Sequence, residues 1–175
     1  MMLGIIAYGS LINPQETKGQ REQPTHIVPV KLETFKRSFN QRPAWRKNTS
    51  KNSAVLNVQA SEQNWLNAIC YCYAEFNFTT LDHRERGYTR TSIPADKINS
   101  YQGQELPELD EAFIYSGKKE YRDSTLLPNP NYLEICLMGA KKWGESFYDD
   151  FLNTTHINNE ILLREYLSTS GTYRT

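Results

Sequence analysis

The segment WLNAICYCYAEFNF, residues 65–78, has the clearest strand pattern in the chain. Side chains of a β-strand alternate between its two faces. Here one face carries small or apolar side chains, those of Leu66, Ala68, Cys70, Cys72, Ala74, Phe76 and Phe78. The opposite face carries Ile69, Tyr71 and Tyr73. Because both faces are largely apolar, the pattern predicts a strand that is buried on both sides.

Three strand-like segments precede this one. Residues 3–8, LGIIAY, form a short apolar run that ends at a Gly-Ser pair, which indicates a buried strand leading into a loop. Residues 26–42 are consistent with one long bent strand or with two strands, since Pro29 favours an edge or a bend. Residues 54–58 predict a further strand, after a polar and basic loop at 43–53.

The periodicity changes after residue 78. Thr79 is a candidate helix N-cap, and Asp82 follows three residues later, as in a capping box. Gly87 is a candidate C-terminal stop, so a short helix is expected between them. Residues 88–95 and 111–117 predict two more strands.

The C-terminal part of the chain is predicted to be helical. Asn129 is placed to cap a helix that has Pro130 at its first position. An apolar stripe follows at helical spacing, made by Tyr132, Ile135, Cys136, Gly139, Ala140, Trp143, Phe147 and Phe151. Residues 158–168 predict a final amphipathic helix.

Strands that come first and helices that come last indicate an α+β fold. We expect a curved, mainly antiparallel sheet with helices packed outside it. A chain of 175 residues is long enough to bury one core, so residues 1–175 are expected to form a single domain.

Composition limits the classes of partner. The chain has 20 lysines and arginines against 20 aspartates and glutamates, so no net field attracts nucleic acid or an acidic membrane. The apolar N-terminus has no cationic start and is too short to span a bilayer. The three cysteines cannot all pair, which favours a reducing cytoplasm. We expect a cytoplasmic monomer or homodimer with a small-molecule ligand.

Several site chemistries find no support in the sequence. Cys70 and Cys72 have no further ligand at metal-binding spacing, and their place in a strand favours the core over a metal site. His26, His83 and His156 are scattered, with no obvious serine or cysteine partner. No Walker loop or GxGxxG motif occurs. The sequence therefore predicts neither a metal nor a cofactor.

The loop after the first strand is one candidate binding element. Tyr8, Gly9, Ser10 and Leu11 end that strand, and a glycine lets backbone N–H groups approach a ligand closely. Such a loop can bind a carboxylate or a developing oxyanion. Taken alone, the pattern is more typical of an ordinary turn.

The second candidate is the segment LDHRERGY, residues 81–88, which places Glu85 among cationic side chains beside a glycine. From local sequence alone, Glu85 is a solvated helix residue. Arg84 and Arg86 point to different faces, so at most one of them faces a pocket with Glu85. A catalytic role for Glu85 needs further support.

That support comes from a resemblance to a known family. YGSL at 8–11, LDHRERGY at 81–88 and PNPNYLEICLMGAKKWG at 128–144 resemble, in the same order, three segments of the γ-glutamylcyclotransferase superfamily. The tail is similar to the glutathione-pathway enzymes of the superfamily, and the middle is similar to its ChaC branch. The resemblance covers most of the chain and leaves the substrate open.

The resemblance implies a fold, a reaction and a set of site residues. The fold is a small β-barrel-like sheet with flanking helices. The reaction cleaves a γ-glutamyl amide, without a cofactor, and releases 5-oxoproline and an amine, amino acid or peptide. The catalytic glutamate corresponds to Glu85 and the pocket tyrosine to Tyr132, while residues 8–11 form the loop that binds a carboxylate or oxyanion.

This reaction suits the residues available. The α-amino group of the substrate is itself the nucleophile, and a held intramolecular geometry can supply an effective molarity of roughly 10⁵ M. The protein must then move a proton, which a partly desolvated glutamate with a raised pKa can do, and we assign that step to Glu85. Arg84 is the candidate to hold a substrate carboxylate, with Arg86 as the alternative and Arg42 as a weaker one.

Two other interpretations remain at this stage. A non-catalytic module could bind a γ-glutamyl or amino-acid ligand in the same pocket. A scaffold protein would carry Glu85 on its surface, more than about 6 Å from any pocket that residues 8–11 form, which is outside hydrogen-bond reach.

Overall fold

The computed structural model describes residues 1–18, 22–44, 53–158 and 160–171. The strands are β1 (Leu3–Ala7), β2 (His26–Gln41), β3 (Ser53–Tyr73), β4 (Tyr88–Ser92), β5 (Ile98–Ser100), β6 (Glu111–Gly117), β7 (Leu127–Pro128), β8 (Thr155–Ile157) and β9 (Ile161–Leu162). The α-helices are α1 (Phe78–Arg84), α2 (Pro130–Lys142), α3 (Glu145–Thr154) and α4 (Leu163–Ser170). Short 3₁₀ helices are η1 (Ser10–Ile12), η2 (Pro14–Thr17), η3 (Ala95–Lys97) and η4 (Lys119–Tyr121).

The strands form one mixed sheet in the order β4-β6-β1-β3-β2-β8-β9, with β5 added to β2 and β7 to β3. The pairs β1–β6, β2–β8 and β3–β7 are parallel, and the others are antiparallel. The predicted α+β class and mainly antiparallel sheet are therefore confirmed. The predicted barrel is wrong, because a barrel requires the end strands to pair, and in the described residues β4 pairs with β6 and β9 with β8.

A long hairpin of β2 and β3 forms the centre of the sheet. The strands predicted at 54–58 and 65–78 are one strand of 21 residues, which ends at Tyr73 and not at residue 78. From Leu66 to Tyr73 every residue is buried, as the apolar character of both faces predicted. Of the two alternatives for residues 26–42, the structure has one long strand, and its irregularity lies at Thr34, which has φ of 63° at a register shift between Glu33 and Phe35, and not at Pro29.

Helix α1 starts two residues earlier than the sequence indicated. Its N-cap is Asn77, whose Oδ1 accepts a hydrogen bond from the Thr79 N–H at 3.0 Å, and Thr79 therefore does not cap. The carboxylate of Asp82, predicted to belong to a capping box, accepts a bond from the Tyr115 hydroxyl instead. The helix ends at Arg84 and not before Gly87, and its C-cap is Glu85, whose N–H donates to the Leu81 carbonyl.

The two candidate caps can be separated by mutation. We expect Asn77→Ala to lower the free energy of unfolding by about 1 kcal/mol, because one N–H of the first helical turn loses its acceptor. The matched change Thr79→Ala should leave the free energy of unfolding within about 0.5 kcal/mol of the wild type. Urea denaturation measures both values. A larger loss for Thr79→Ala than for Asn77→Ala would contradict the cap.

The helical tail is interrupted twice. Helix α2 begins as predicted, since the Oδ1 atom of Asn129 accepts from the Tyr132 N–H at 3.0 Å, and it stops before Gly144, whose φ of 101° suits a glycine. The helix predicted at 158–168 is wrong in its first part. Asn158 has φ of 55° in the turn from β8 to β9, and α4 begins only at Leu163.

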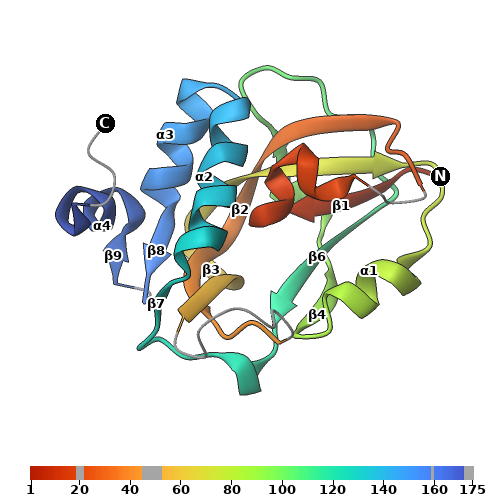
Figure 1. Ribbon diagram of the computed structural model, residues 1–175. Coiled ribbons are helices and arrows are strands. Elements are labelled where there is room, and N and C mark those ends of the chain that lie inside the picture. The colour runs from red at the N-terminus through yellow and green to blue at the C-terminus, as the bar shows by residue number, and fades with distance from the viewer. Residues whose placement is uncertain (19–21, 45–52, 159, 172–175) are drawn as a thin grey trace.

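The arrangement of helices leaves the end of β1 between two parts of the molecule. Helices α2, α3 and α4 gather at one end of the sheet, and α1 lies at the other end beside β4 and β6 (Figure 1). The α2 helix also packs on η1, which follows β1 directly. Elements from both ends therefore meet near the loop after β1.

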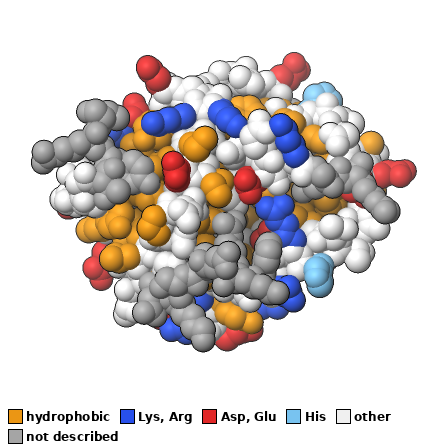
Figure 2. Space-filling view, viewed as in Figure 1, with side chains coloured by type: hydrophobic (Ala, Val, Ile, Leu, Met, Phe, Trp, Pro, Cys, Tyr) orange, Lys and Arg blue, Asp and Glu red, His pale blue; other side chains and the backbone are white. Residues whose placement is uncertain are grey.

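The surface is mixed in character. Figure 2 shows acidic, basic and hydrophobic side chains interspersed over one face of the molecule, as a net charge of zero suggests. In the described part of the chain, no helix is long and apolar enough to cross a membrane.

Candidate active site

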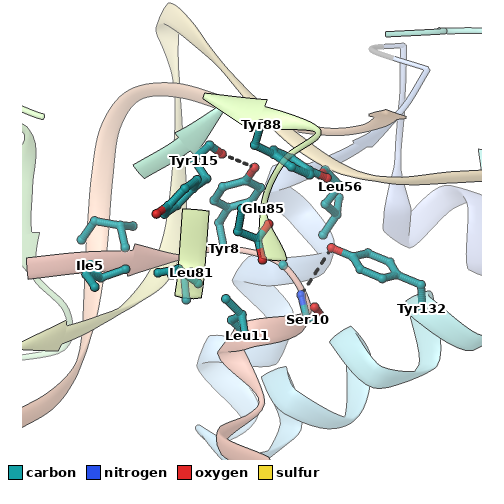
Figure 3. A pocket seen from close by; sticks show the side chains of 13 residues that line it. Ile5, Tyr8, Ser10, Leu11, Leu56, Leu81, Glu85, Tyr88, Tyr115 and Tyr132 are labelled. Carbon is teal, nitrogen blue, oxygen red and sulfur yellow. Dashed lines mark hydrogen bonds between the residues drawn. The ribbon is translucent and has the colours of Figure 1, made fainter. Parts of the chain in front are cut away.

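A pocket lies where β1 ends, and it contains about 440 Å³ of space, part of it open to solvent. Its walls come from seven elements or their ends, and its lining residues are Ile5, Ile6, Ala7, Tyr8, Gly9, Ser10, Leu11, Leu56, Leu81, Glu85, Tyr88, Tyr115 and Tyr132. The fold therefore brings into one pocket every residue predicted for the site except Arg84. Figure 3 shows the Glu85 side chain among the rings of Tyr8, Tyr88 and Tyr132.

The loop after β1 is fixed by hydrogen bonds to two other elements. From α2, the indole Nε1 of Trp143 donates to the Ile12 carbonyl at 2.9 Å. From β3, the hydroxyl of Tyr71 donates to the Leu11 carbonyl at 2.7 Å. Gly139 of α2 packs directly on the backbone of Asn13. The sequence islands at 8–11 and 128–144 are thus in contact, and the loop has one defined conformation.

Gly9 lies directly against the hydroxyl of Tyr132. Gly9 has a φ of −118° and a ψ of −132°. A Cβ at this position would overlap the Tyr132 hydroxyl. That hydroxyl also accepts a bond from the Ser10 N–H at 3.4 Å. Gly9 is therefore required here because the ring of Tyr132 lies against the loop (Figure 3).

Glu85 occupies the corner between α1 and β4. Its N–H donates to the Leu81 carbonyl and its carbonyl accepts from the Tyr88 N–H, both at 2.8 Å. The side chain lines the pocket that residues 8–11 form, and it is only 19% exposed. The interpretation of Glu85 as a surface residue remote from that loop is therefore wrong. Both the backbone and the side chain of this residue have a fixed place.

A charged cluster holds α1 against the strands. The Tyr115 hydroxyl donates to Asp82 Oδ1 at 2.5 Å, and the Arg90 guanidinium donates to both oxygens of the same carboxylate. The Arg90 guanidinium also lies 3.9 Å from the centre of the Phe78 ring. Since Asp82 precedes Glu85 by less than one helical turn, these contacts restrict the position of Glu85 as well.

Four tyrosines line the pocket, and three donate their hydroxyl protons to fixed acceptors. Tyr8 donates to the Tyr115 carbonyl at 2.6 Å, and Tyr88 donates to the Leu56 carbonyl at 2.7 Å. Burial is the main cause that raises the pKa of Tyr8 and the pKa of Tyr115 well above the ordinary value. These phenols stay neutral at physiological pH. Among the described residues that line the pocket, Glu85 carries the only carboxylate.

No protein-family model and no curated protein sequence matches the chain. Solved structures do. A γ-glutamyl cyclotransferase superposes with a TM-score of 0.63 at 18% identity, over 86% of each chain. A glutathione-specific γ-glutamyl cyclotransferase from yeast superposes with a TM-score of 0.55 at 14% identity, over 95% of this chain and 99% of that one. YkqA from Bacillus subtilis superposes with a TM-score of 0.64 at 11% identity, over 96% of this chain and 55% of that one.

The chain has the γ-glutamyl cyclotransferase fold. Identities this low are evidence of the fold alone, so the roles of individual residues depend on the geometry of this site. The superpositions confirm the γ-glutamyl cyclotransferase fold that the resemblance implied.

In this γ-glutamyl cyclotransferase fold, Glu85 also lines a second pocket, which we call the outer pocket, the first being the inner pocket. The outer pocket shares Ser10, Glu85, Tyr88 and Tyr132 with the inner pocket and adds Pro43, Ala44, Val55, Arg84 and Gly87. The carboxylate of Glu85 thus borders two adjacent spaces. The predicted loop at 43–53 falls largely outside the described residues.

Arg84 lines only this outer pocket, and acidic groups surround its guanidinium. Its Nη1 donates to the Glu16 carbonyl at 3.1 Å, and its Nε lies 3.7 Å from Glu85 Oε1. It therefore ties the end of α1 to η2, and substrate binding by Arg84 stays a prediction. The alternatives lie elsewhere: Arg86 is exposed, and Arg42 pairs with Asp123.

Sequence reasoning missed several residues of the pocket wall, above all Tyr88 and Tyr115. Both lie on strands, where a tyrosine can face either the core or a pocket until the pairing of the strands is known. The antiparallel register of β4 with β6 decides it. The predicted core positions of Cys70 and Cys72 are confirmed, since both are buried free thiols with their sulfur atoms 3.7 Å apart. Within the described residues, no group of His, Cys, Asp and Glu is arranged to hold a metal ion.

Proposed function

We propose that this protein is a cyclotransferase that cleaves a γ-glutamyl amide bond and releases 5-oxoproline together with an amine, amino acid or peptide. The observation that carries the proposal is the shared pocket of the Glu85 carboxylate and the loop Tyr8–Leu11. The fold, which is also that of solved γ-glutamyl cyclotransferases, supports it.

In the proposed reaction the substrate supplies the nucleophile. Its α-ammonium must first lose a proton, and Glu85 accepts it as general base. The free amine then attacks the γ-carbonyl carbon, a new carbon–nitrogen bond closes the five-membered ring, and the old amide bond breaks. Glu85 returns its proton to the departing nitrogen and then accepts the second proton that the ring nitrogen loses as the lactam forms. The sequence of steps needs neither an enzyme nucleophile nor a cofactor.

The loop after β1 would stabilise negative charge in this reaction. In a 3₁₀ helix the first N–H groups have no partner within the helix, and η1 begins at Ser10. Backbone N–H groups of the loop at Gly9 to Leu11 are therefore suited to an α-carboxylate or to the oxyanion on the attacked carbonyl, and the Ser10 N–H, which donates to the Tyr132 hydroxyl at 3.4 Å, would exchange that bond for one to the ligand. The Tyr132 hydroxyl, in contact with this loop, would hydrogen-bond the same group.

The apolar walls of the inner pocket support a proton transfer by Glu85. Leu11, Leu56 and Leu81 line the space beside the carboxylate. A carboxylate that is mostly withdrawn from water exchanges a proton with a bound amine more effectively than a solvated one does. The outer pocket, bordered by the same carboxylate, is the natural space for the leaving group.

The test is a panel of γ-glutamyl compounds. We expect 5-oxoproline release from at least one of glutathione, γ-glutamyl amino acids and γ-glutamyl amines, measured by chromatography of the product. The α-glutamyl isomers of the same dipeptides are the matched control, since their α-amino group cannot close this ring onto the scissile bond. Tight binding of γ-glutamyl compounds without product would contradict the enzyme and favour the non-catalytic binding module.

A further inference from the structure

An arginine lies in the core of the protein, one layer behind the site. Arg37 of β2 is fully buried, with 0% of its surface exposed. Its guanidinium donates hydrogen bonds to acceptors from several elements: Thr155 Oγ1, the Tyr8 carbonyl, the carbonyl and Oδ1 of Asn67, Thr154 Oγ1 and the Phe151 carbonyl. The guanidinium also lies 4.1 Å from the centre of the Phe151 ring.

Every acceptor of Arg37 is neutral. Among the described residues, no carboxylate lies within ion-pair distance of its guanidinium. Burial lowers the pKa of Arg37 to about 9, so the side chain remains charged at neutral pH. Burying a cation without a counter-ion costs free energy that an apolar side chain of similar volume would not. The buried charge of Arg37 therefore suggests a role other than stabilising the fold.

One of its bonds leads directly to the site. Nη1 of Arg37 donates to the Tyr8 carbonyl at 3.2 Å. In a trans peptide the C=O and the N–H point in opposite directions, so the Gly9 N–H on the same peptide is directed away from Arg37. Gly9 lines the pocket. The bond therefore fixes the orientation of one of the loop N–H groups and polarises it as a donor.

We propose that Arg37 is a positioning residue that orients the Tyr8–Gly9 peptide and supplies the buried positive charge for an anionic group of the ligand in the pocket. The anion would be a carboxylate, which here rests on the proposed γ-glutamyl function. Arg37 does not line the pocket and acts through the peptide.

The size of the effect follows from the separation. One peptide group and two hydrogen bonds would lie between the guanidinium and the anion, which places them on the order of 9 Å apart. At an effective dielectric constant of about 20, a unit charge at that distance changes the affinity for an anion by about ten-fold or somewhat more. A neutral ligand of the same shape would not experience this attraction.

The experiment compares 5-oxoproline, an anion, with its neutral carboxamide. We expect wild-type protein to bind the acid more tightly, and Arg37→Met to weaken binding of the acid about ten-fold while changing that of the amide less than about two-fold. Isothermal titration calorimetry measures both affinities. Arg37→Lys retains the charge and should retain most of the preference for the acid.

Thr155→Val is the matched control for the polar network. It removes one acceptor of Arg37 that lies away from the loop, and it should lower stability without changing the ratio of the two affinities. Equal loss of both ligands in Arg37→Met would assign Arg37 a structural role and overturn the proposal. If Arg37→Met does not fold, the affinities of the wild-type protein test the proposal. Equal affinity for the acid and the amide, or no binding of either, would overturn it.

Failure of the proposed function has a different signature. A protein that prefers the acid over the amide, loses that preference in Arg37→Met and releases no 5-oxoproline from the γ-glutamyl panel would retain the role of Arg37. In that case only the cyclotransferase reaction would be wrong.

Discussion

Glu85→Gln is expected to reduce kcat by about 10³-fold while leaving the fold and the affinity for 5-oxoproline close to those of the wild type. Glutamine has the shape of glutamate and can hydrogen-bond, but it cannot accept the proton of the substrate ammonium. The backbone bonds that fix residue 85 do not involve its side chain, so they survive the change. The loss should therefore appear in the rate of the chemical step.

Steady-state release of 5-oxoproline measures the rate, and thermal unfolding measures the fold. Glu134→Gln is the matched control, because Glu134 is exposed on α2 two residues from Tyr132. It should retain the wild-type rate. Wild-type turnover in Glu85→Gln would exclude Glu85 as the general base. No other described residue that lines the inner pocket carries a carboxylate that could take over this role.

The position of Glu85 illustrates what the sequence could and could not predict. Its neighbourhood, a short helix followed by a strand, was predictable from the change of periodicity after residue 78. The residue that ends the helix was not, because Gly87 has the amino-acid type of a helix stop. In the structure Gly87 packs against Ala44, where a Cβ would come within 2.8 Å of the Ala44 Cβ. The glycine thus serves a tertiary contact that no local pattern reveals.

Predictions based on local chemistry succeeded where the interaction itself is local. The cap of α2 by Asn129 is an example, since donor and acceptor lie three residues apart. At α1 two residues, Asn77 and Thr79, could cap, and local sequence does not rank them reliably. The prediction of a barrel was wrong because barrel closure is not a local interaction. Closure depends on whether β4 and β9 pair, and the two strands are far apart in sequence.

The buried arginine is the largest feature that the sequence did not suggest. Arginine is seldom fully buried, so a solvated side chain is the simplest expectation for Arg37, although strand alternation places it on the same face as Phe35 and Phe39. Its acceptors come from β3, α3 and β8 and from the end of β1, and only the assembled sheet brings them together. Buried polar networks of this kind depend on tertiary structure, which limits what a single sequence can reveal about a site.

The contact between Gly9 and Tyr132 leads to the second large prediction. Gly9→Ala is expected to lower kcat/KM by about 10²-fold, because the added Cβ overlaps the Tyr132 hydroxyl and must displace the loop, the ring or both. Alanine is a sharper probe than valine, since it adds a single carbon. The Tyr132→Phe background then separates the overlap with the hydroxyl from any other effect of the added Cβ.

Tyr132→Phe provides the rescue. Without the hydroxyl, the nearest neighbours of the new Cβ are the Leu56 Cβ and the ring carbon Cζ of residue 132, both 3.7 Å away, which is ordinary contact. We expect the single change Tyr132→Phe to lower kcat/KM by about ten-fold through the lost hydrogen bond. The double variant Gly9→Ala/Tyr132→Phe should then be more active than Gly9→Ala alone. Losses that simply multiply would show that the two residues act independently, and the close contact would then not explain why residue 9 is a glycine.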